Sequence, residues 1–409
     1  MSDWPIAGFT STGSKRPEVL FGELDAGGWQ PPVRMVSAAG CRVRDEAGRD
    51  YVDYVMALGA VALGYGHPEV GAAATAAIES GVVGSLPPVL EEEVASEIRR
   101  LMPWIEQLRF LKTGAEACAA AVRLARVATG RDFVIGCGYH GWLDWCQGAR
   151  GSGIPAATRE LYAELPFNDV DESRRLIRAG GDRLACVITE PIVVSEPTPE
   201  WLETVRSETE RAGALLVLDE VKTAGRVALG GGAERYAIRP DLVVLGKAIA
   251  NGFPLAVVGG RREVMAAVAH TWISSTLSTE AVALAAARAT LQVLERDRVP
   301  EALERVGARL LAGLERLAER HPAVIGGVAG VPQMCFCRFQ QERQAPALAR
   351  AAARRGVLFK RSAYNFVSLA HDEGTIDQTL ALLDEALDEV ARIGGGDEER
   401  APPEPEVKP

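Results

Sequence analysis

Short, continuous apolar runs bounded by turn residues constrain the fold of this chain most. They occupy its middle, at Phe133–Gly136, Leu184–Thr189, Ala214–Leu218 and Leu242–Leu245. Runs of this length without polar alternation are typical of parallel strands that are buried on both faces of a sheet. Segments with helical spacing separate them. This alternation predicts an α/β fold with a mostly parallel, doubly wound sheet.

The pattern changes along the 409 residues, and the changes predict the domain limits. Residues 1–50 are interpreted as an N-terminal arm and hairpin that pack with a smaller domain. Residues 51–295 carry the alternating pattern and are predicted to form the large domain. Long amphipathic helices mark 296–393 as a smaller α+β C-terminal domain, and the composition of 394–409 is typical of a disordered tail.

The net charge and the apolar pattern of the chain argue against some classes of partner. The net charge is −10, from 45 basic and 55 acidic residues, which argues against nucleic acid or an anionic membrane as a partner. No apolar stretch approaches the roughly 18 residues of a membrane helix, and no secretory signal is recognised.

The seven cysteines form no CxxC pair and are interpreted as reduced thiols of a cytoplasmic protein. The five histidines lack metal-ligand spacing, so no metal site is expected.

A carboxylate and an amine follow neighbouring apolar runs. Asp219 ends one run and Lys247 follows the next. Ligands of an open parallel sheet bind beyond the carboxyl ends of its strands, so both side chains are expected to face one crevice. Such a pair suits pyridoxal 5′-phosphate (PLP): the amine forms a Schiff base, and the carboxylate keeps the ring nitrogen protonated. From spacing alone, a plain salt bridge at the sheet edge explains the pair equally well.

Two weaker signals lie upstream. Thr113-Gly114 stands between a strand and a helix, where backbone N–H groups can bind a phosphate. An ordinary helix capped by Thr113 is the alternative. Tyr139-His140 follows another strand, and its aromatic ring can stack on a cofactor or simply pack against the protein.

Around these residues the chain resembles a known family. The segment LLVLDEVKTAGRVALGGGAERYAIRPDLVVLGKAIANGFPLAVVGGRREVM resembles the cofactor-lysine region of class III (fold type I) PLP-dependent aminotransferases. It is most similar to their glutamate-1-semialdehyde aminomutase-like branch. The segments FLKTGAEACAAAVRLARVATGRD, GYHGWLD, ITEPI and STLSTEAVALAAARATL resemble further family segments in the same order, over roughly residues 36–392. The resemblance implies the fold type I architecture, with a large PLP-binding domain.

It also implies the main chemical roles. Lys247 would carry PLP as a Schiff base and later move a proton as general base and acid. Asp219 would pair with the ring nitrogen. Gly114 and Ala115 would donate backbone N–H groups to the phosphate, although the family usually has Ser or Thr at the second position.

Further matching positions would complete the cofactor site. Tyr139 would stack on one face of the ring, and Val221 would pack on the other. Glu190 would line the site near the cofactor. Thr276 would reach the phosphate of the neighbouring subunit, which implies a homodimer whose sites are built by two chains.

Several positions depart from the family pattern. Leu58 stands where the aminomutase branch has Trp, and Ser195 where it often has Asn. Lys222 stands where Met, Gln or Ile is common; a side chain that points to solvent is favoured over one that tunes the Schiff base. These positions border the substrate pocket, so a strict aminomutase substrate is in doubt.

The substrate's carboxylate, if it has one, would need a cation. Arg16 and Arg34 of the N-terminal arm are candidates, because family arms fold over the site. For each, a solvated surface cation is the alternative.

Taken together, these signals predict a cytoplasmic, homodimeric, PLP-dependent aminotransferase. It would move an amino group from a small-molecule donor to an aldehyde or ketone acceptor through Lys247. The alternative is a PLP-dependent isomerase on the same scaffold, an aminomutase or an amino-acid racemase. A non-catalytic PLP-fold protein is disfavoured, because a retired site would be free to lose Lys247 and Asp219.

Overall fold

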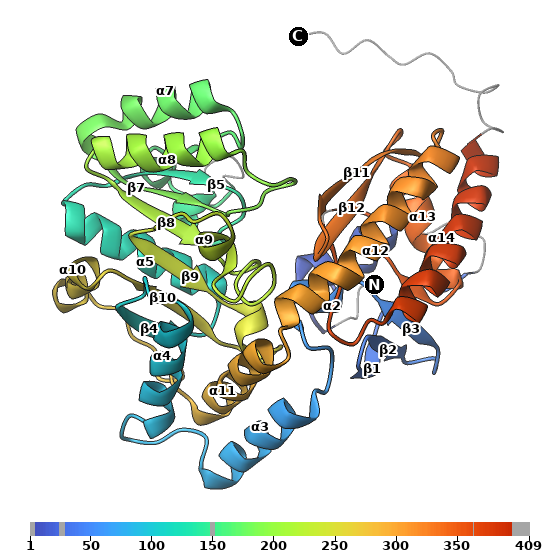
Figure 1. The fold of residues 1–409 in the computed structure, drawn as a ribbon, viewed down its shortest axis with the longest axis horizontal. Coiled ribbons are helices and arrows are strands. Elements are labelled where there is room, and N and C mark those ends of the chain that lie inside the picture. Colours follow the sequence, from blue (N-terminus) through green and yellow to red (C-terminus); the bar gives the residue numbers. More distant parts are fainter. Residues whose placement is uncertain (1–4, 24–28, 148–151, 363, 395–409) are drawn as a thin grey trace. The chain divides into compact units, whose positions relative to one another are not determined.

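A computed structural model describes residues 5–23, 29–147, 152–362 and 364–394. Contacts between residues divide the chain into two units (Figure 1). The large unit comprises residues 56–304 and 368–370, and the small unit comprises 1–55, 305–367 and 371–409. The predicted limits at 50/51 and 295/296 remain predictions, and all but the first residue of the predicted tail lies outside the described residues.

A seven-stranded sheet forms the centre of the large unit. Its order is β4-β10-β9-β8-β7-β5-β6. β10 runs antiparallel to both of its neighbours, β4 and β9, and all other adjacent pairs are parallel. The strands are β4 Gln107–Leu111, β5 Phe133–Cys137, β6 Tyr162–Glu164, β7 Leu184–Thr189, β8 Leu215–Asp219, β9 Leu242–Leu245 and β10 Ala256–Gly260. The predicted α/β fold with a mostly parallel sheet is thereby confirmed.

Helices cover both faces of this sheet. α7 (Val170–Gly180) and α8 (Pro199–Arg211) lie side by side on one face, and α5 (Gly114–Thr129) lies on the other (Figure 1). Every residue of β7 and β9 is buried, which explains why these runs are apolar throughout. The alanines of α5 let that helix approach the strands closely, so the strand ends are held by a tightly packed core.

The remaining elements of the large unit surround the sheet. α11 (Ala281–Arg296) packs on α3, on α4 and on the turn that begins at Lys247. The other helices are α2 Met56–Gly59, α3 Pro68–Ser80, α4 Val89–Leu101, α6 Ala156–Arg159, α9 Gly231–Arg235 and α10 Arg262–Met265. The 3-10 turns are η2 Asp144–Cys146, η4 Gly181–Arg183, η5 Lys247–Ala250 and η6 Ala266–His270.

The small unit contains two small sheets and amphipathic helices. One sheet has the order β1-β2-β3-β13 and the other β11-β12-β14. The strands are β1 Met35–Ala39, β2 Arg42–Asp45, β3 Asp50–Asp53, β11 Ile325–Val331, β12 Met334–Phe339, β13 Val357–Leu358 and β14 Asn365–Phe366. The helices are η1 Gly13–Lys15, α1 Pro17–Phe21, α13 Gln344–Arg354 and α14 Glu373–Gly394, while α12 Val299–Arg320 begins in the large unit.

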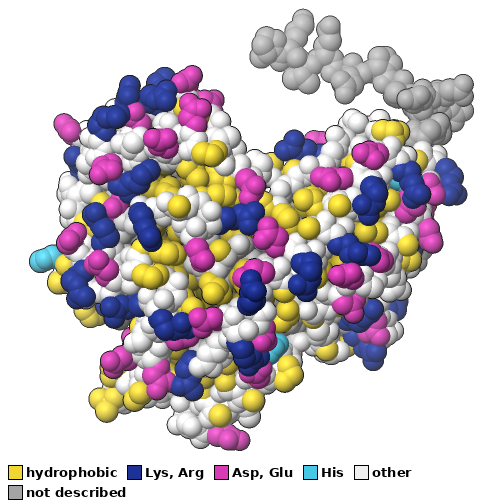
Figure 2. Space-filling model, in the orientation of Figure 1, with side chains coloured by type: hydrophobic (Ala, Val, Ile, Leu, Met, Phe, Trp, Pro, Cys, Tyr) yellow, Lys and Arg dark blue, Asp and Glu magenta, His cyan; other side chains and the backbone are white. Residues whose placement is uncertain are grey.

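The distribution of charged side chains, the state of the cysteines and the apolar character of the helices can be compared with the sequence predictions. On the face drawn in Figure 2, basic and acidic side chains are interspersed. All seven cysteines are buried and unpaired, as predicted for reduced thiols. Within the described residues, no helix is both long and apolar enough to cross a membrane.

Candidate active site

The carboxyl ends of five strands bring the predicted site residues to one edge of the large sheet. β4, β5, β7, β8 and β9 all run in the same direction. Asp219 is the last residue of β8. The other predicted residues come just after a strand: Thr113-Gly114-Ala115 after β4, Tyr139-His140 after β5, Glu190 after β7 and Lys247 after β9. This is the edge where an open parallel sheet binds its ligands.

Lys247 occupies a strained backbone position. Its φ is 48°, in the left-handed region that costs a residue with a side chain about 1–2 kcal/mol. Such strain is commonly retained at functional sites. Burial, and after it the charge of Lys222, lowers the pKa of the Lys247 amine to about 8. A sizeable share of the amine is therefore neutral near physiological pH, as a nucleophile or general base requires.

Asp219 is buried and held on both oxygens. Its Oδ2 accepts a hydrogen bond from the Cys118 thiol at 3.3 Å and lies 2.8 Å from His140 Nδ1, while Oδ1 accepts one from the Val221 amide at 3.1 Å. Burial alone would raise the pKa of Asp219, but the hydrogen bond and charge of His140 keep this pKa below its ordinary value. Asp219 therefore stays a carboxylate, which suits a protonated ring nitrogen.

Cys118, His140 and Asp219 also present the donor atoms of a small metal site. Without a metal, burial raises the pKa of Cys118 well above its ordinary value, and the protonated thiol donates a hydrogen bond to Asp219 Oδ2. The three groups are better described as a hydrogen-bonded support for the Asp219 carboxylate.

The N-terminus of α5 offers an anion site. Thr113 caps the helix, and a reciprocal bond from the Glu116 side chain completes a capping box, so the predicted cap is present. Within the described part of the chain, the Gly114 and Ala115 amides donate to no protein group. A Cβ on Gly114 would lie 3.1 Å from Val221, and one on Gly141 would collide with Ala115. The two amides are therefore orphan donors at a helix N-terminus, a place that favours an anion.

Tyr139 follows β5 and Val221 follows β8, two strands on the same side of β4 in the sheet. The Tyr139 side chain is 61% exposed. Val221 contacts the sites of Gly114 and Gly246, which precedes Lys247. A ring held between the helix N-terminus and Lys247 would thus lie next to Val221.

Glu190 and Lys222 form an ion pair inside the site. Lys222 Nζ lies 2.8 Å from Glu190 Oε1, and the two side chains are only 14% and 5% exposed. The interpretation that Lys222 points to solvent is therefore wrong. The sequence could not reveal the pair, since 32 positions separate the two residues and each follows a different strand.

The other predicted residues are placed elsewhere. Thr276 is exposed in a turn of the large unit. Arg16 and Arg34 belong to the small unit, where Arg34 forms a salt bridge with Glu46. The roles of all three remain predictions, as do those of the other predicted site residues.

Arg226 has no counterpart in the sequence prediction. This buried guanidinium donates to the carbonyl oxygens of Lys222 and Gly59. It thereby ties the site to a left-handed turn at Met56–Leu58, where φ is 45–59° in three successive residues. The only sequence signal is an arginine four residues after Lys222, at the spacing of one turn.

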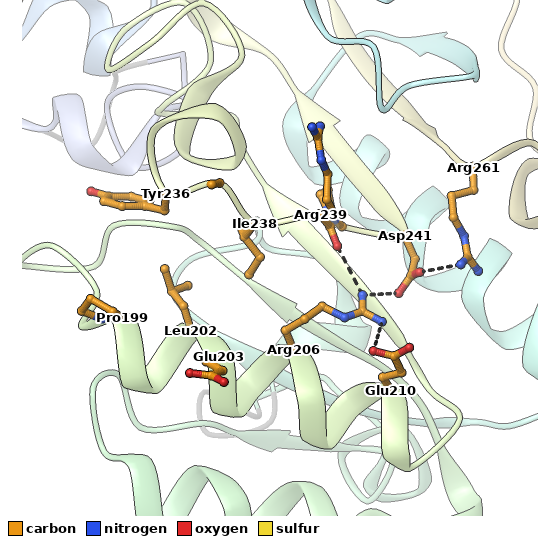
Figure 3. Close-up of a pocket in the computed structure, with 12 residues that line it drawn as sticks. Pro199, Leu202, Glu203, Arg206, Glu210, Tyr236, Ile238, Arg239, Asp241 and Arg261 are labelled. Atoms are coloured by element: carbon orange, nitrogen blue, oxygen red, sulfur yellow. Dashed lines mark hydrogen bonds and ion pairs between the residues drawn. The ribbon is translucent and has the colours of Figure 1, made fainter.

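A separate pocket of about 580 Å³ lies near Asp241, at the end of the sheet where β9 begins (Figure 3). Asp241 precedes β9 there and accepts from the Leu216 amide and from Arg206 at 2.9 Å. Arg261 lies 3.3 Å from the same carboxylate. These charges neutralise one another, so the pocket is better explained as a structural ion network than as the reactive site.

Comparisons with known proteins identify the family of the chain. The family model described as aminotransferase class-III matches residues 25–391. Glutamate-1-semialdehyde 2,1-aminomutase of Pyrobaculum aerophilum is 36% identical over 395 residues, covering 88% of this chain and 93% of the relative.

Solved structures point to the same family. The FumI protein of Sphingopyxis sp. MTA144, solved in its PLP internal aldimine form, has a TM-score of 0.86 and 28% identity, covering 93% of this chain and 94% of that one. A β-phenylalanine aminotransferase from Variovorax paradoxus has a TM-score of 0.80 and 26% identity, covering 91% and 90%. The chain belongs to the class III aminotransferase family of PLP-dependent enzymes and has their fold type I architecture.

Proposed function

We propose that the strand-end cluster of the large unit binds PLP and uses it to move the amino group of a small substrate. The observation that carries this proposal is the pair Lys247 and Asp219. The amine has a lowered pKa, the carboxylate is buried and stays ionised, and they follow adjacent parallel strands. The Gly114 and Ala115 amides supply the place for the phosphate.

The residues fit this cofactor by their chemistry. When bound, PLP supplies an electrophilic carbon for amines and an electron sink for the pair that a departing proton leaves behind. Asp219 would hold the ring nitrogen protonated. Lys247 would bind the aldehyde carbon and, once displaced by a substrate amine, take and return a proton at its Nζ. Tyr139 would exclude water from one ring face, and Val221 from the other.

For the reaction, we place intramolecular amino transfer first. The sequence alone favoured an aminotransferase, but the aminomutase similarity covers 88% of the chain at 36% identity, which favours the isomerase alternative. The substrate would be an amino aldehyde of the type that the relative's name gives.

An aminotransferase is the second candidate. Leu58 and Ser195 depart from the aminomutase pattern, and the Variovorax paradoxus neighbour is an aminotransferase. Both reactions use the same Lys247 and Asp219, so the two candidates differ in substrate pocket and not in cofactor chemistry.

One experiment separates the candidates. Glutamate-1-semialdehyde is incubated with the PLP-loaded protein, with no other carbonyl compound present. A mutase converts it to the isomer with the amino group on C1 and the carbonyl on C2. An aminotransferase instead loses the absorbance of bound pyridoxal when a suitable amino donor is added, and regains it with a keto acid. Neither response across a broad panel of donors would refute amino transfer.

We further propose that the chain is a homodimer. Large apolar side chains are exposed on the single chain in segments that flank the site, including Trp142, Trp272 and Leu277. Exposed apolar side chains of this size are typical of interfaces. In this proposed dimer, the exposed Thr276 would reach the neighbouring site. The cytoplasmic location stays a prediction, and the seven unpaired cysteines are consistent with it.

A further inference from the structure

Lysine is rare in this chain, and two of its lysines, Lys222 and Lys247, lie in the candidate site. Only six of the 45 basic residues are lysines. Lys247 is accounted for by the proposed function, whereas Lys222 is not. A buried amine costs free energy unless it is paired, so its presence here needs a reason.

Lys222 holds Glu190 in a fixed place. One carboxylate oxygen of Glu190 lies 2.8 Å from Lys222 Nζ, and the other accepts a hydrogen bond from the Tyr139 amide at 3.1 Å. Glycine at position 138 permits this close approach, because a Cβ there would collide with the Glu190 carboxylate. The residue also has a φ of +110°, which favours glycine. Glu190 therefore links an amine to the loop that carries the predicted stacking ring.

The backbone of Lys222 is held as firmly as its side chain. Its carbonyl oxygen accepts a hydrogen bond from Arg226 Nε at 3.1 Å. On one side Val221 donates its amide to Asp219, and on the other Thr223 donates its hydroxyl to Glu220. The ammonium group is thus held in place within the site.

We propose that Lys222 is a positioning residue that holds Glu190 beside Tyr139 and keeps a fixed positive charge in the same strand-end cluster as Lys247. The two turns meet there, because Val221, which precedes Lys222, lies 3.5 Å from the Cβ position of Gly246, which precedes Lys247. This charge favours the neutral form of Lys247, which is the form that attacks the cofactor and accepts a proton. The proposal concerns the state of Lys247 before any cofactor binds. It therefore does not depend on which amino transfer reaction the enzyme catalyses.

The charges around Lys247 agree with this role. After burial, Lys222 is the largest cause that lowers the pKa of Lys247, and Arg226 also lowers it. Glu190 and Asp219 act in the opposite direction. Removing Lys222 would leave burial and Arg226 to oppose the two carboxylates, so the pKa of the Lys247 amine would rise.

The test measures Lys247 in the protein without PLP. Trace labelling with acetic anhydride is followed across pH, and peptide mass spectrometry gives the labelling midpoint of each lysine. In Lys222→Met, the Lys247 midpoint is expected to rise by about one pH unit. In Glu190→Gln it is expected to fall, since a negative charge is lost. In Lys222→Arg, which keeps the charge, it is expected to stay near that of the parent.

Lys112→Met is the matched control. Lys112 forms an ion pair with Glu280 at the same 2.8 Å, with the two side chains 15% and 12% exposed. Its loss should leave the Lys247 midpoint unchanged. An unchanged midpoint in folded Lys222→Met, or a shift of the same sign in Glu190→Gln, would overturn the proposal. If Lys222→Met does not fold, the Glu190→Gln and Lys222→Arg results decide. A protein that shows the expected shifts but binds no PLP would refute the proposed function and leave this inference standing.

Discussion

Replacing Gly141 with alanine tests whether the loop after β5 shapes the phosphate site. Gly141 has a φ of +102°, which costs a residue with a side chain about 1–2 kcal/mol. The added Cβ would also collide with the Cβ of Ala115 and lie 2.8 Å from its Cα. Overpacking of this kind costs about 1–3 kcal/mol. The free energy of unfolding is therefore expected to fall by about 2–5 kcal/mol in total.

Gly130→Ala provides the comparison. Gly130 ends α5 with a φ of +67°, and a Cβ there meets nothing within 4 Å. This variant should lose only the backbone term of about 1–2 kcal/mol. Urea unfolding at one pH measures both variants. A Gly141→Ala loss no larger than that of Gly130→Ala would refute the close approach of Gly141 to Ala115.

A second measurement connects Gly141 to the cofactor. Relief of the collision must displace the first turn of α5, where the Ala115 amide is proposed to bind phosphate. Loss of one such charge-assisted hydrogen bond costs about 1.5–3 kcal/mol, which weakens PLP binding roughly tenfold or more. PLP titration followed by absorbance should reveal this for Gly141→Ala, while Gly130→Ala binds as the parent does. Equal affinities in the two variants would place the phosphate elsewhere.

Three further predictions follow from the site and the surface. Lys247→Ala should abolish the visible absorbance of bound PLP, whereas Asp219→Asn should keep it and lower kcat by about 10²–10³; full activity of Lys247→Ala would refute the site. Burial raises the pKa of Glu220 to about 7 in the folded protein, so folding favours its protonated form and stability falls as pH rises from about 4.5 to 7. Glu220→Gln should flatten that slope in unfolding measured at several pH values, and an unchanged slope would contradict the shift. Trp272, 80% exposed on one chain, should be covered in a dimer, so light scattering should give about twice 43.6 kDa and Trp272→Glu should move the mass toward the monomer.

Sequence reasoning located the strands whose ends carry the chemistry. β5, β7, β8 and β9 coincide with the apolar runs, because a strand buried on both faces leaves a continuous signal in the sequence. Asp219 and Lys247 were singled out for the same reason, since Asp219 follows one such run and Lys247 follows the next after Gly246. β10 was not anticipated as an antiparallel strand, since direction in a sheet depends on pairing and not on local pattern.

The contacts that tune the site could not be predicted from the sequence. The bond between His140 and Asp219 joins residues 79 positions apart, and the Arg226 bond to the Gly59 carbonyl joins residues 167 apart. Hydrophobic periodicity carries no information about such pairs. The left-handed turn at Met56–Leu58 contains no glycine before Gly59, so local sequence gives no sign of its positive φ values.

The order of strands in the large sheet determines when, during translation, the cofactor site can form. β4, which leads into the Gly114 turn, is an edge strand, and its neighbour in the sheet is β10. A ribosome must therefore synthesise roughly 150 more residues after β4 before that strand can join the sheet. At about 5–20 residues per second, this takes roughly 8–30 s. During that time the proposed phosphate site and Lys247 cannot be brought together. A nascent or truncated chain that ends before β10 therefore lacks a complete place for PLP, and capture of the cofactor reports that β10 has joined the sheet.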